Sequence, residues 1–483
     1  MPFGRVLDAN AAPVRPDGRY VLYWMIGARR TEWSFGLQRA VERSRELRRP
    51  LLVLEPLRVA YPFASDRLHR FVLDGMRDNA ARFRAAGVTY HPYVEPEPGA
   101  ARGLLERLAA DACLVVTDDV PFFFLPRMVR AAALRLPLRL EQVDGNGLLP
   151  LRQAQRAYPT AHSFRALVQR ELPAQLSGFP AADPLAGYAP PRRAGLPADV
   201  RRRWPAAAPG LLDGRLDLAS LPIDHRVSPA PVRGGPTAAR AALRAFLDRL
   251  DDYEQDRNHP DRDATSGLSP YLHFGHLSPH AVFAAVMIRE GWHDGHLGRP
   301  AGGARTGWWG VGPSTEAFLD QLVTWRELGL NRCVFDESSA RWESLPAWAR
   351  ATLAAHARDR RPHRYAVEEL ERAATHDRLW NAAQTQLLRE GRLHNYLRML
   401  WGKRILEWSA TPQDALVAML RLNDRWALDG RDANSISGIT WVLGRYDRPW
   451  GPERPIFGTV RYMSSENTAR KLRVREYLAR YAS

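Results

Sequence analysis

The chain has 483 residues, 45% of them hydrophobic and 25% charged, which is ordinary for a folded protein and excludes collagen-like, coiled-coil and wholly disordered chains. At roughly 100 to 200 residues per domain, this length predicts two or three domains. The 69 basic residues outnumber the 53 acidic ones, and the net charge of +16 favours a polyanionic partner such as nucleic acid. Since Lys403 and Lys471 are the only lysines, an arginine-rich surface without such a partner explains the charge equally well.

Membrane-spanning segments and disulfides are not expected. The longest apolar runs, such as 20–26 and 113–116, fall far short of the roughly 20 residues needed to cross a bilayer. The N-terminus lacks the apolar core of a signal peptide, so we expect a cytoplasmic protein. Cys113 and Cys333 are too few for a disulfide framework or a four-cysteine zinc site, and we expect both to be inert core thiols.

The first 150 residues alternate short apolar runs with amphipathic stretches rich in Ala, Leu and Arg. This pattern is typical of βαβ units and predicts an α/β domain over 1–150 with a doubly wound parallel sheet. The first strand is followed by Gly27-Ala28-Arg29-Arg30, which is neither GxGxxG nor GK[ST], so an ordinary dinucleotide or ATP site is not expected there. The predicted strands cover 20–25, 51–54, 88–93, 113–117 and 137–143.

A linker over 151–236 is predicted to connect this domain to a larger one. From residue 178 onward the linker is rich in Pro, Gly, Ala and Arg, which is typical of a surface connection rather than a packed element. From 237 to 483 helical periodicity dominates and alternating strand runs are missing, so this larger domain is predicted to be all-α. Its expected helices include 238–250, 315–330, 367–389 and 393–408.

Tryptophans are concentrated in the second half, where thirteen of the fifteen follow Val200. Trp401 and Trp408 are seven residues apart, which is roughly 10 Å along a helix that rises 1.5 Å per residue. Asn395 and Arg398 extend the same stripe at three-residue steps. An amide, a guanidinium and indole rings on one face suit a flat heteroaromatic ligand, although an ordinary buried helix explains the stripe as well.

A second candidate site is the hydroxyl-rich segment 265–269, which precedes an apolar helical pattern. Free N–H groups at a helix start, together with Thr and Ser hydroxyls, can hold a phosphate; a plain helix cap is the alternative. His273, His276 and His280 follow at helical spacing. No carboxylate or cysteine accompanies them, so no metal site is predicted.

Two later segments are polar or basic. Residues 422–435 crowd Asp, Arg and Asn between apolar runs, which indicates a solvated loop or a polar pocket wall; Arg425 and Arg431 argue against a calcium loop.

The end of the chain is basic, which suits either phosphate contacts or a solvated terminal helix. Its basic residues are Arg454, Arg461, Arg470, Lys471, Arg473, Arg475 and Arg480.

Six motifs, in order through the C-terminal half, resemble class II DNA photolyases of the photolyase/cryptochrome family. In the N-terminal 150 residues only the α/β pattern, the strand around 21–25 and Trp33 look similar, and the linker offers no resemblance. The six motifs cover 265–275, 318–328, 376–384, 393–408, 429–434 and 454–463.

The resemblance implies an α/β antenna domain joined by a long linker to an all-helical domain that holds FAD, whose reduced form is active. It implies light-dependent repair of cyclobutane pyrimidine dimers, in which excited reduced flavin gives an electron to a flipped-out dimer and recovers it after the ring splits. Because the photon supplies the energy and the flavin the electron, no nucleophile or metal is needed. The expected partner is UV-damaged DNA, bound by a monomer. The antenna chromophore, a deazaflavin or a folate or none, is not identified.

The resemblance also implies roles for individual residues. Asn434 would lie beside the flavin N5, and Trp325 and Trp450 would stack against the dimer. Gln321 stands where the family usually has Glu; an amide donates and accepts but carries no charge, which predicts retained binding with altered repair efficiency. The implied catalytic residues are Asn434, Gln321, Trp325 and Trp450; the FAD-binding residues are Tyr253, Thr265, Ser266, Gly267, Leu268, Ser269, Arg326, Asn395, Arg398, Asp429, Asp432 and Asn434, with Arg398 pairing with an Asp of 429–432; the electron relay is Trp401, Trp380 and Trp408; and the DNA-binding residues are Arg454, Arg461, Arg470 and Lys471.

Three other functions share parts of the pattern. A cryptochrome-type flavin photoreceptor would keep FAD and the tryptophan chain, but such sensors often carry a long C-terminal extension and this chain stops soon after its basic helix, so repair is expected. A (6-4) photolyase usually uses a pair of histidines, for which no motif is visible. A non-enzymatic nucleic-acid-binding protein would be colourless when purified, whereas a flavoprotein would be yellow or blue.

Overall fold

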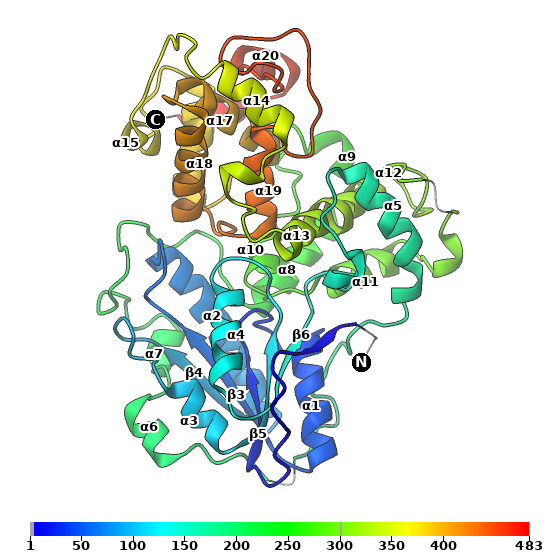
Figure 1. Ribbon diagram of the computed structural model, residues 1–483, viewed down its shortest axis with the longest axis vertical. Coiled ribbons are helices and arrows are strands. Elements are labelled where there is room, and N and C mark those ends of the chain that lie inside the picture. Colours follow the sequence, from blue (N-terminus) through cyan, green and yellow to red (C-terminus); the bar gives the residue numbers. More distant parts are fainter. Residues whose placement is uncertain (1–3, 191, 300–301, 483) are drawn as a thin grey trace. The chain divides into compact units, whose positions relative to one another are not determined.

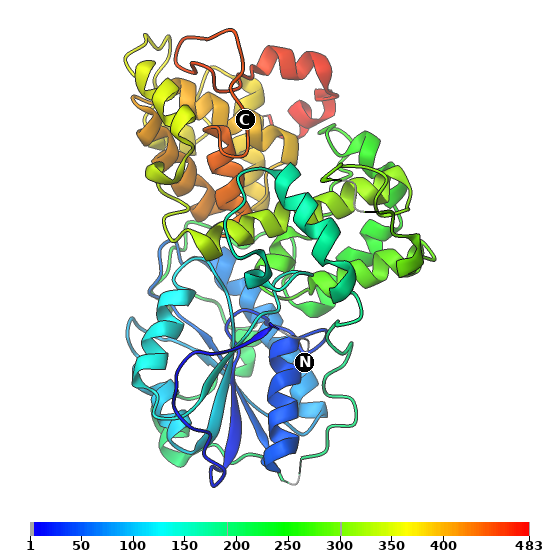
Figure 2. The ribbon, with the colours of Figure 1, turned by 45° about the vertical axis from the view of Figure 1, so that its right-hand side comes forward.

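The computed structural model describes residues 4–190, 192–299 and 302–482 (Figures 1 and 2). The chain forms two compact units, and each is assembled from separate stretches of sequence. The first contains Met1–Ala154, Glu171–Arg244 and Leu268–Gly291; the second contains Gln155–Arg170, Ala245–Gly267 and Trp292–Ser483.

The first unit is built around a six-stranded sheet with the order β1-β6-β5-β2-β3-β4. Strands β2 to β6 are parallel and coincide with the five predicted runs, and the strand order reverses between β2 and β5, which confirms the doubly wound prediction. Strand β1 pairs antiparallel with β6 and was not predicted, because three residues are too few to show a pattern. The strands are β1 Val6–Asp8, β2 Tyr20–Trp24, β3 Leu51–Leu57, β4 Thr89–Val94, β5 Ala112–Asp118 and β6 Leu140–Val143.

Each face of this sheet has its own apolar core, because successive strand side chains point to opposite faces. Val21 and Tyr23 of β2 pack with α1 and α2, whereas Leu22 and Trp24 pack with α3 and α4. A strand that is apolar on both faces is typical of the centre of a parallel sheet covered by helices. The covering helices are α1 Phe35–Leu47, α2 Asp66–Ala85, α3 Leu104–Ala110 and α4 Leu125–Arg135.

The Pro- and Gly-rich stretch 178–236 lies within the first unit, and its described residues have little regular secondary structure; its role as a linker stays a prediction. Its described part contains the short helices α6 Ala198–Arg203 and α7 Pro209–Leu212, and most of its apolar side chains are buried, although Leu216 and Val232 are exposed. Trp204 donates from Nε1 to the carbonyl of Ala100 at 2.7 Å, and Leu212 joins the core that includes α2. The apolar residues are spaced too irregularly to show as a helix or strand in the sequence.

The three histidines at helical spacing do not share one helix. The helix α10 Ser269–His273 ends before Gly275, which has a φ of +70°, and α11 Pro279–Arg289 starts afresh. His276 lies in the turn between them. Among the described residues no group of three or more His, Cys, Asp or Glu side chains could hold a metal ion.

The second unit is helical, and no named strand occurs in its described part, which confirms the all-α prediction. The predicted helix 315–330 becomes α12, a π-helical segment and α13 without a break, whereas the predicted helix 367–389 is interrupted before Asp377, which caps α16. The helices used below are α8 Pro236–Leu247, α9 Tyr253–Asp256, α12 Pro313–Leu319, α13 Arg326–Phe335, α14 Ala347–Ala355, α15 Val367–Glu371, α16 Arg378–Glu390, α17 Asn395–Trp408, α18 Pro412–Trp426, α19 Ala433–Val442, α20 Ser465–Lys471 and α21 Arg475–Arg480.

Among the described helices, none is both long enough and apolar enough to span a membrane. Both cysteines are buried and free, as predicted for core thiols, and burial raises the pKa of Cys113 and of Cys333.

Candidate functional site

Helix α17 presents a fixed guanidinium next to an exposed amide. Arg398 donates from Nη1 to Asn423 Oδ1 at 3.0 Å, and its Nη2 lies 3.5 Å from Asp429 Oδ2. Asn423 is only 3% exposed and donates in turn to the Ser435 hydroxyl at 2.7 Å. The guanidinium is therefore held in one orientation, while Asn395, one turn earlier on the same helix, is exposed.

The polar segment before α19 is an ordered turn. Asp432 Oδ1 accepts the backbone N–H of Asn434 at 2.7 Å, so Asp432 caps α19. Asp424 Oδ1 accepts the backbone N–H of Arg431 at 2.9 Å. The Asn434 side chain is exposed. These contacts give the carboxylates structural partners and leave the amide of Asn434 at the surface of the unit.

Trp380, Trp401 and Trp408 form a continuous chain in the helical core. Each is at most 2% exposed. Trp380 donates from Nε1 to the carbonyl of Trp401 at 3.0 Å, and its ring meets that of Trp408 edge to face, with centroids 5.4 Å apart. Trp401 Nε1 donates to Gln384 Oε1 at 2.9 Å. The contacts link the middle of α17 to its C-terminal end through α16.

Two further indoles stack where α13 meets α19. The rings of Trp325 and Trp441 are within 14° of parallel, with centroids 4.4 Å apart. Gly329, one turn after Trp325, permits the approach, because a Cβ there would lie 2.9 Å from the Ser437 hydroxyl and 3.0 Å from the carbonyl of Ala433. Since α13 and α19 pack this closely, the two indoles share one platform.

Gln321 and Trp325 belong to a π-helical segment, Asp320–Trp325, between α12 and α13. A π-helical turn inserts one extra residue into a helix and is frequent at functional sites. Both side chains are partly exposed whereas residues 322–324 are buried, so Gln321 and Trp325 share the open side of the segment. Arg326 follows directly as the first residue of α13.

The predicted phosphate-binding segment crosses the division of the chain into units. Residues 265–267 belong to the second unit, and 268–269 belong to the first. Gly267 has a φ of +68°, a conformation that favours glycine, and a Cβ there would meet nothing within 4 Å. Arg249 donates from Nη2 to the carbonyl of Thr265 at 3.0 Å, which fixes the start of the segment within the second unit.

Tyr253, at the start of α9, has a buried ring that packs against two aromatic rings and one guanidinium. It is 7% exposed and meets Phe246 and Phe318 edge to face, with centroids 5.7 and 5.6 Å away. The guanidinium carbon of Arg257 lies 5.2 Å from the ring centroid. Burial raises the pKa of the Tyr253 hydroxyl. These contacts pack the Tyr253 ring into the unit, and the FAD-binding role implied for Tyr253 stays a prediction.

Trp450 is an exposed indole flanked by cations. Its exposed fraction is 36%, and the guanidinium carbons of Arg448 and Arg461 lie 4.7 and 5.1 Å from the ring centroid. Aromatic rings among cations are typical of surfaces that bind nucleic acid. The four residues predicted to contact DNA are all exposed: Arg454, Arg461, Arg470 and Lys471. The last two end α20, where cations also stabilise the helix terminus.

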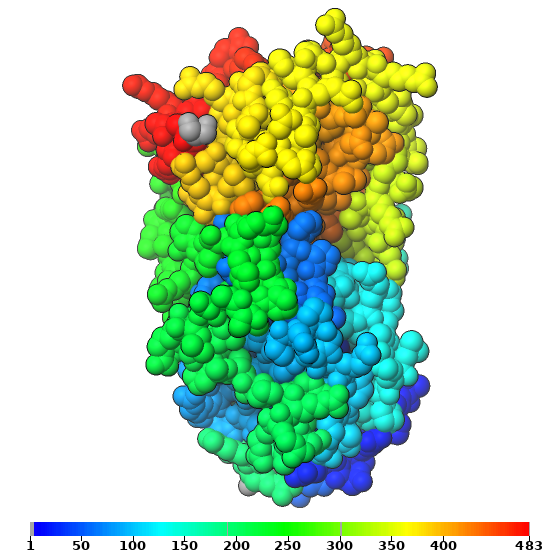
Figure 3. All heavy atoms as spheres, turned by 90° about the vertical axis from the view of Figure 1, so that its left-hand side faces the viewer, coloured from blue at the N-terminus to red at the C-terminus, as the bar shows by residue number. Residues whose placement is uncertain are grey.

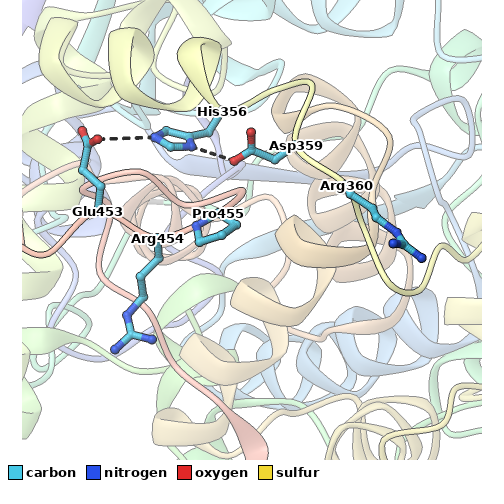
Figure 4. A pocket seen from close by; sticks show the side chains of 6 residues that line it. All are labelled: His356, Asp359, Arg360, Glu453, Arg454 and Pro455. Carbon is cyan, nitrogen blue, oxygen red and sulfur yellow. Dashed lines mark hydrogen bonds and ion pairs between the residues drawn. The ribbon is translucent and has the colours of Figure 1, made fainter.

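An open cavity of about 470 Å³ lies beside Arg454 (Figure 4). His356 stands between two carboxylates there, with Nδ1 2.7 Å from Asp359 Oδ2 and Nε2 3.8 Å from Glu453 Oε2. Figure 4 shows the Arg454 side chain pointing away from them. None of the residues implied to bind FAD lines this cavity, whose lining is His356, Asp359, Arg360, Glu453, Arg454 and Pro455.

Sequence reasoning missed Trp441, and it included Asn423 only as one of the polar residues of 422–435. Asn423 had a detectable signal, because it follows Met419 by four residues and Leu416 by seven, and so places an amide on the apolar stripe of α18. Trp441 had none, because its partner Trp325 lies far away in the sequence.

Comparison with known proteins finds similarity over nearly the whole chain. It is 34% identical over 478 residues to the deoxyribodipyrimidine photo-lyase of Methanothermobacter thermautotrophicus, with 99% of this chain and 97% of the relative covered. It is 31% identical over 467 residues to the deoxyribodipyrimidine photo-lyase of Potorous tridactylus, with 94% and 80% covered. A solved class III photolyase of Agrobacterium tumefaciens shares the fold, with a TM-score of 0.69 and 17% identity over 98% of this chain and 87% of that one. No family model matches the chain.

Proposed function

The chain belongs to the DNA photolyases of the photolyase/cryptochrome family, and from this premise we propose that it is a class II enzyme whose residues 237–483 hold FAD. Its activity is the light-dependent repair of cyclobutane pyrimidine dimers in DNA. The observation that carries this assignment is the 34% identity, which runs through 99% of the chain rather than through one motif.

FAD is the cofactor of this family, and when light excites its reduced form it supplies the single electron that the repair needs. The residues around Arg398 fit such a group. The guanidinium is fixed by Asn423 and Asp429, while the amides of Asn395 and Asn434 are exposed on α17 and α19, which pack together. Amides and a guanidinium offer the donors and acceptors that the imide edge of a flavin requires. We assign these residues to the flavin end and residues 265–269 to the pyrophosphate.

The stacked pair Trp325 and Trp441 is our candidate platform for the lesion. A dimer must leave the duplex stack before it can approach a protein-bound cofactor, and photolyases are among the enzymes known to flip bases. Flat rings hold extruded bases by stacking. Gln321, on the open side of the same π-helical segment, can both donate to and accept from a pyrimidine edge. Trp450 stays a candidate for stacking on the dimer, because it is exposed.

The buried chain Trp401, Trp380 and Trp408 is our candidate electron relay. Trp380 donates from its indole to the backbone carbonyl of Trp401 at 3.0 Å, and its ring meets that of Trp408 edge to face at 5.4 Å, so Trp380 contacts both of the others. The relay would restore the reduced state of the cofactor and is not needed for repair once that state is reached. The antenna chromophore, the monomeric state and the cytoplasmic location stay predictions.

The test uses the purified full chain. We expect a yellow or blue preparation with a flavin absorption spectrum. After chemical reduction, illumination at near-UV or blue wavelengths of a dimer-containing oligonucleotide should restore thymine absorbance, whereas a dark control should not. A chain that carries no flavin and takes none up when it is supplied would overturn the proposal, and a flavin-loaded chain that repairs nothing would indicate a sensor instead.

A further inference from the structure

The candidate relay ends on an indole that does not reach solvent. Trp408 is only 2% exposed. The rings that cover it are Tyr365 and His376, with centroids 5.2 and 5.5 Å away and interplanar angles of 79° and 64°. Tyr365 is partly exposed and His376 is exposed. Figure 3 shows the yellow part of the chain spread over the surface of the second unit. A reductant in solution therefore meets these two rings before Trp408.

Tyr365 and His376 are joined by two hydrogen bonds. The phenol oxygen accepts the backbone N–H of His376 at 3.1 Å and lies 2.6 Å from its Nδ1. Because the backbone N–H already occupies one lone pair of the oxygen, the phenol proton is directed to Nδ1, which accepts it when the imidazole is neutral. Partial burial, followed by the neighbouring His363, lowers the pKa of His376 from 6.5, which keeps the His376 imidazole neutral at pH 7.

The charges around Trp408 tolerate a transient positive indole. The guanidinium carbon of Arg404 lies 5.8 Å from its ring and alone would oppose such a charge. Arg404, however, is paired with three carboxylates at 3.0, 2.6 and 3.5 Å, so the negative charges nearby outnumber the positive one. The three carboxylates are those of Asp377, Glu407 and Glu466.

We propose that Tyr365 is the terminal electron donor of the relay and that His376 is its proton acceptor. The proposal rests on the proposed function, because the oxidant is the indole cation that Trp408 would carry after passing an electron, through the other two tryptophans, to light-excited oxidised FAD. One electron passes from the phenol to the indole, the O–H bond breaks, and the proton binds His376 Nδ1. A neutral indole, a phenoxyl radical and an imidazolium result. A thiol in solution then returns a hydrogen atom to the phenoxyl, and the imidazolium releases its proton to water.

The first test compares Tyr365→Phe, which removes the hydroxyl and keeps the ring, with the parent enzyme loaded with oxidised FAD. After a light flash, transient absorption and electron paramagnetic resonance should detect a tyrosyl radical that grows as the indole cation decays. Tyr365→Phe should lose this radical and slow photoreduction by thiol. The matched control is Tyr481→Phe, which removes a hydroxyl bonded to Glu390 at 2.5 Å and should keep the radical. A parent enzyme without a tyrosyl radical, or a Tyr365→Phe variant that retains it, overturns the proposal.

The second test addresses the proton. His376→Asn places an oxygen acceptor where Nδ1 was but no base, so the radical should be lost while the fold is kept. In the parent enzyme the radical yield should fall on acidification, because a protonated imidazole cannot accept. The titratable and charged groups that face His376 are His363, Asp377, Arg404, Glu407 and Glu466, and all remain in the variant. A His376→Asn variant with full radical yield overturns the assignment of His376.

Repair separates this inference from the proposed function. Chemically reduced Tyr365→Phe needs no relay and should repair dimers as the parent does. If the radical tests fail but the reduced parent enzyme repairs dimers, only the assignment of Tyr365 as terminal donor is overturned. Absence of repair in the reduced parent enzyme removes the proposed function itself.

Discussion

The two units differ in how they use their polar groups. In the α/β unit the point where the strand order reverses is closed by Asp118, whose Oδ2 accepts the backbone N–H groups of Ile26, Gly27 and Ala28 at 3.0, 2.8 and 3.0 Å. Tyr23 donates its hydroxyl to Oδ1 at 2.8 Å. In nucleotide-binding sheets N–H groups at this place hold a phosphate. Here a carboxylate of the chain itself takes them.

In the helical unit, by contrast, a fixed polar group stands beside exposed ones. Arg398 is held by buried partners, but the amides of Asn395 and Asn434 are exposed. Elsewhere in the α/β unit Glu55, fully buried, accepts hydrogen bonds from Arg29, Asn79 and Tyr90. A polar cluster therefore indicates a binding site only where some of its groups are exposed and are not all hydrogen-bonded to other groups of the protein.

The strongest way to break this comparison is Asp118→Ala. The substitution leaves three backbone N–H groups and the Tyr23 hydroxyl without their acceptor in a buried place, and each unsatisfied donor costs about 1–3 kcal/mol. We expect the free energy of unfolding of the first unit to fall by more than about 4 kcal/mol. Urea unfolding followed by circular dichroism measures it. Asp118→Asn keeps an acceptor and should lose less; equal stability of Asp118→Ala and the parent would show that Asp118 has no structural role.

Lys403 sharpens the comparison, because it is a buried charge in the helical unit with one acceptor, the carbonyl of Val442 at 2.5 Å. Burial lowers the pKa of Lys403 from 10.5 to about 7. The unfolded chain thus binds the proton more tightly than the folded one, so stability is lowest below about pH 7 and rises as the pH approaches 10.5. Lys403→Met should lose this rise, which amounts to roughly 5 kcal/mol for the shift from 10.5 to about 7 at 1.36 kcal/mol per unit of pKa.

The measurement for Lys403 is the difference in unfolding free energy between the parent and Lys403→Met across that pH range. Lys471→Met is the matched control, because Lys471 is exposed and the chain has no other lysine. A difference between the parent and Lys403→Met that does not change with pH would contradict the lowered pKa.

At the candidate site we expect a substitution of Arg398 to weaken cofactor binding while the chain still folds. Arg398→Ala removes the group that Asn423 and Asp429 orient, and hydrogen bonds of charged groups contribute about 1.5–3 kcal/mol. We expect FAD affinity to fall by about 2 kcal/mol, roughly thirtyfold in Kd. Flavin fluorescence titration measures it. Arg360→Ala, at an exposed arginine of the open cavity, should bind FAD as the parent does; unchanged affinity of Arg398→Ala would remove Arg398 from the site.

Local patterns predicted the parts of the fold that repeat along the chain. The five parallel strands and helix α17 each carry a continuous apolar periodicity, and their positions agree with the prediction. The edge strand β1 is too short for a pattern, and the buried Trp204 and Leu212 stand alone among Pro, Gly and Arg. The sequence pattern of 315–330 predicted one plain helix, because the single extra residue of a π-helical turn shifts the apolar spacing too little to stand out in an apolar run.

The candidate site was predictable only where its residues lie one helical turn apart. Asn395, Arg398 and Trp401 are such a set on α17. The pair Trp325 and Trp441 depends on the close packing of α13 and α19 at Gly329, and the cover of Trp408 by Tyr365 depends on the chain between α14 and α16. Contacts of that kind join residues from separate elements, so no spacing in the sequence reports them.

The smallest expected effect is that of Gln321→Glu, which restores the residue the family usually carries at the open side of the π-helical segment. Gln321 already offers a donor and an acceptor, so a carboxyl group changes the charge near the dimer rather than the number of hydrogen bonds. We expect dimer-containing DNA to bind about equally well and the photorepair yield to change by less than about tenfold, which is 1.36 kcal/mol. Gln413→Glu adds the same charge on an exposed face of α18 and should leave the yield unchanged. Identical yields for the parent and Gln321→Glu would show that the position does not take part in repair, and the open side of the π-helical segment would then act through Trp325 alone.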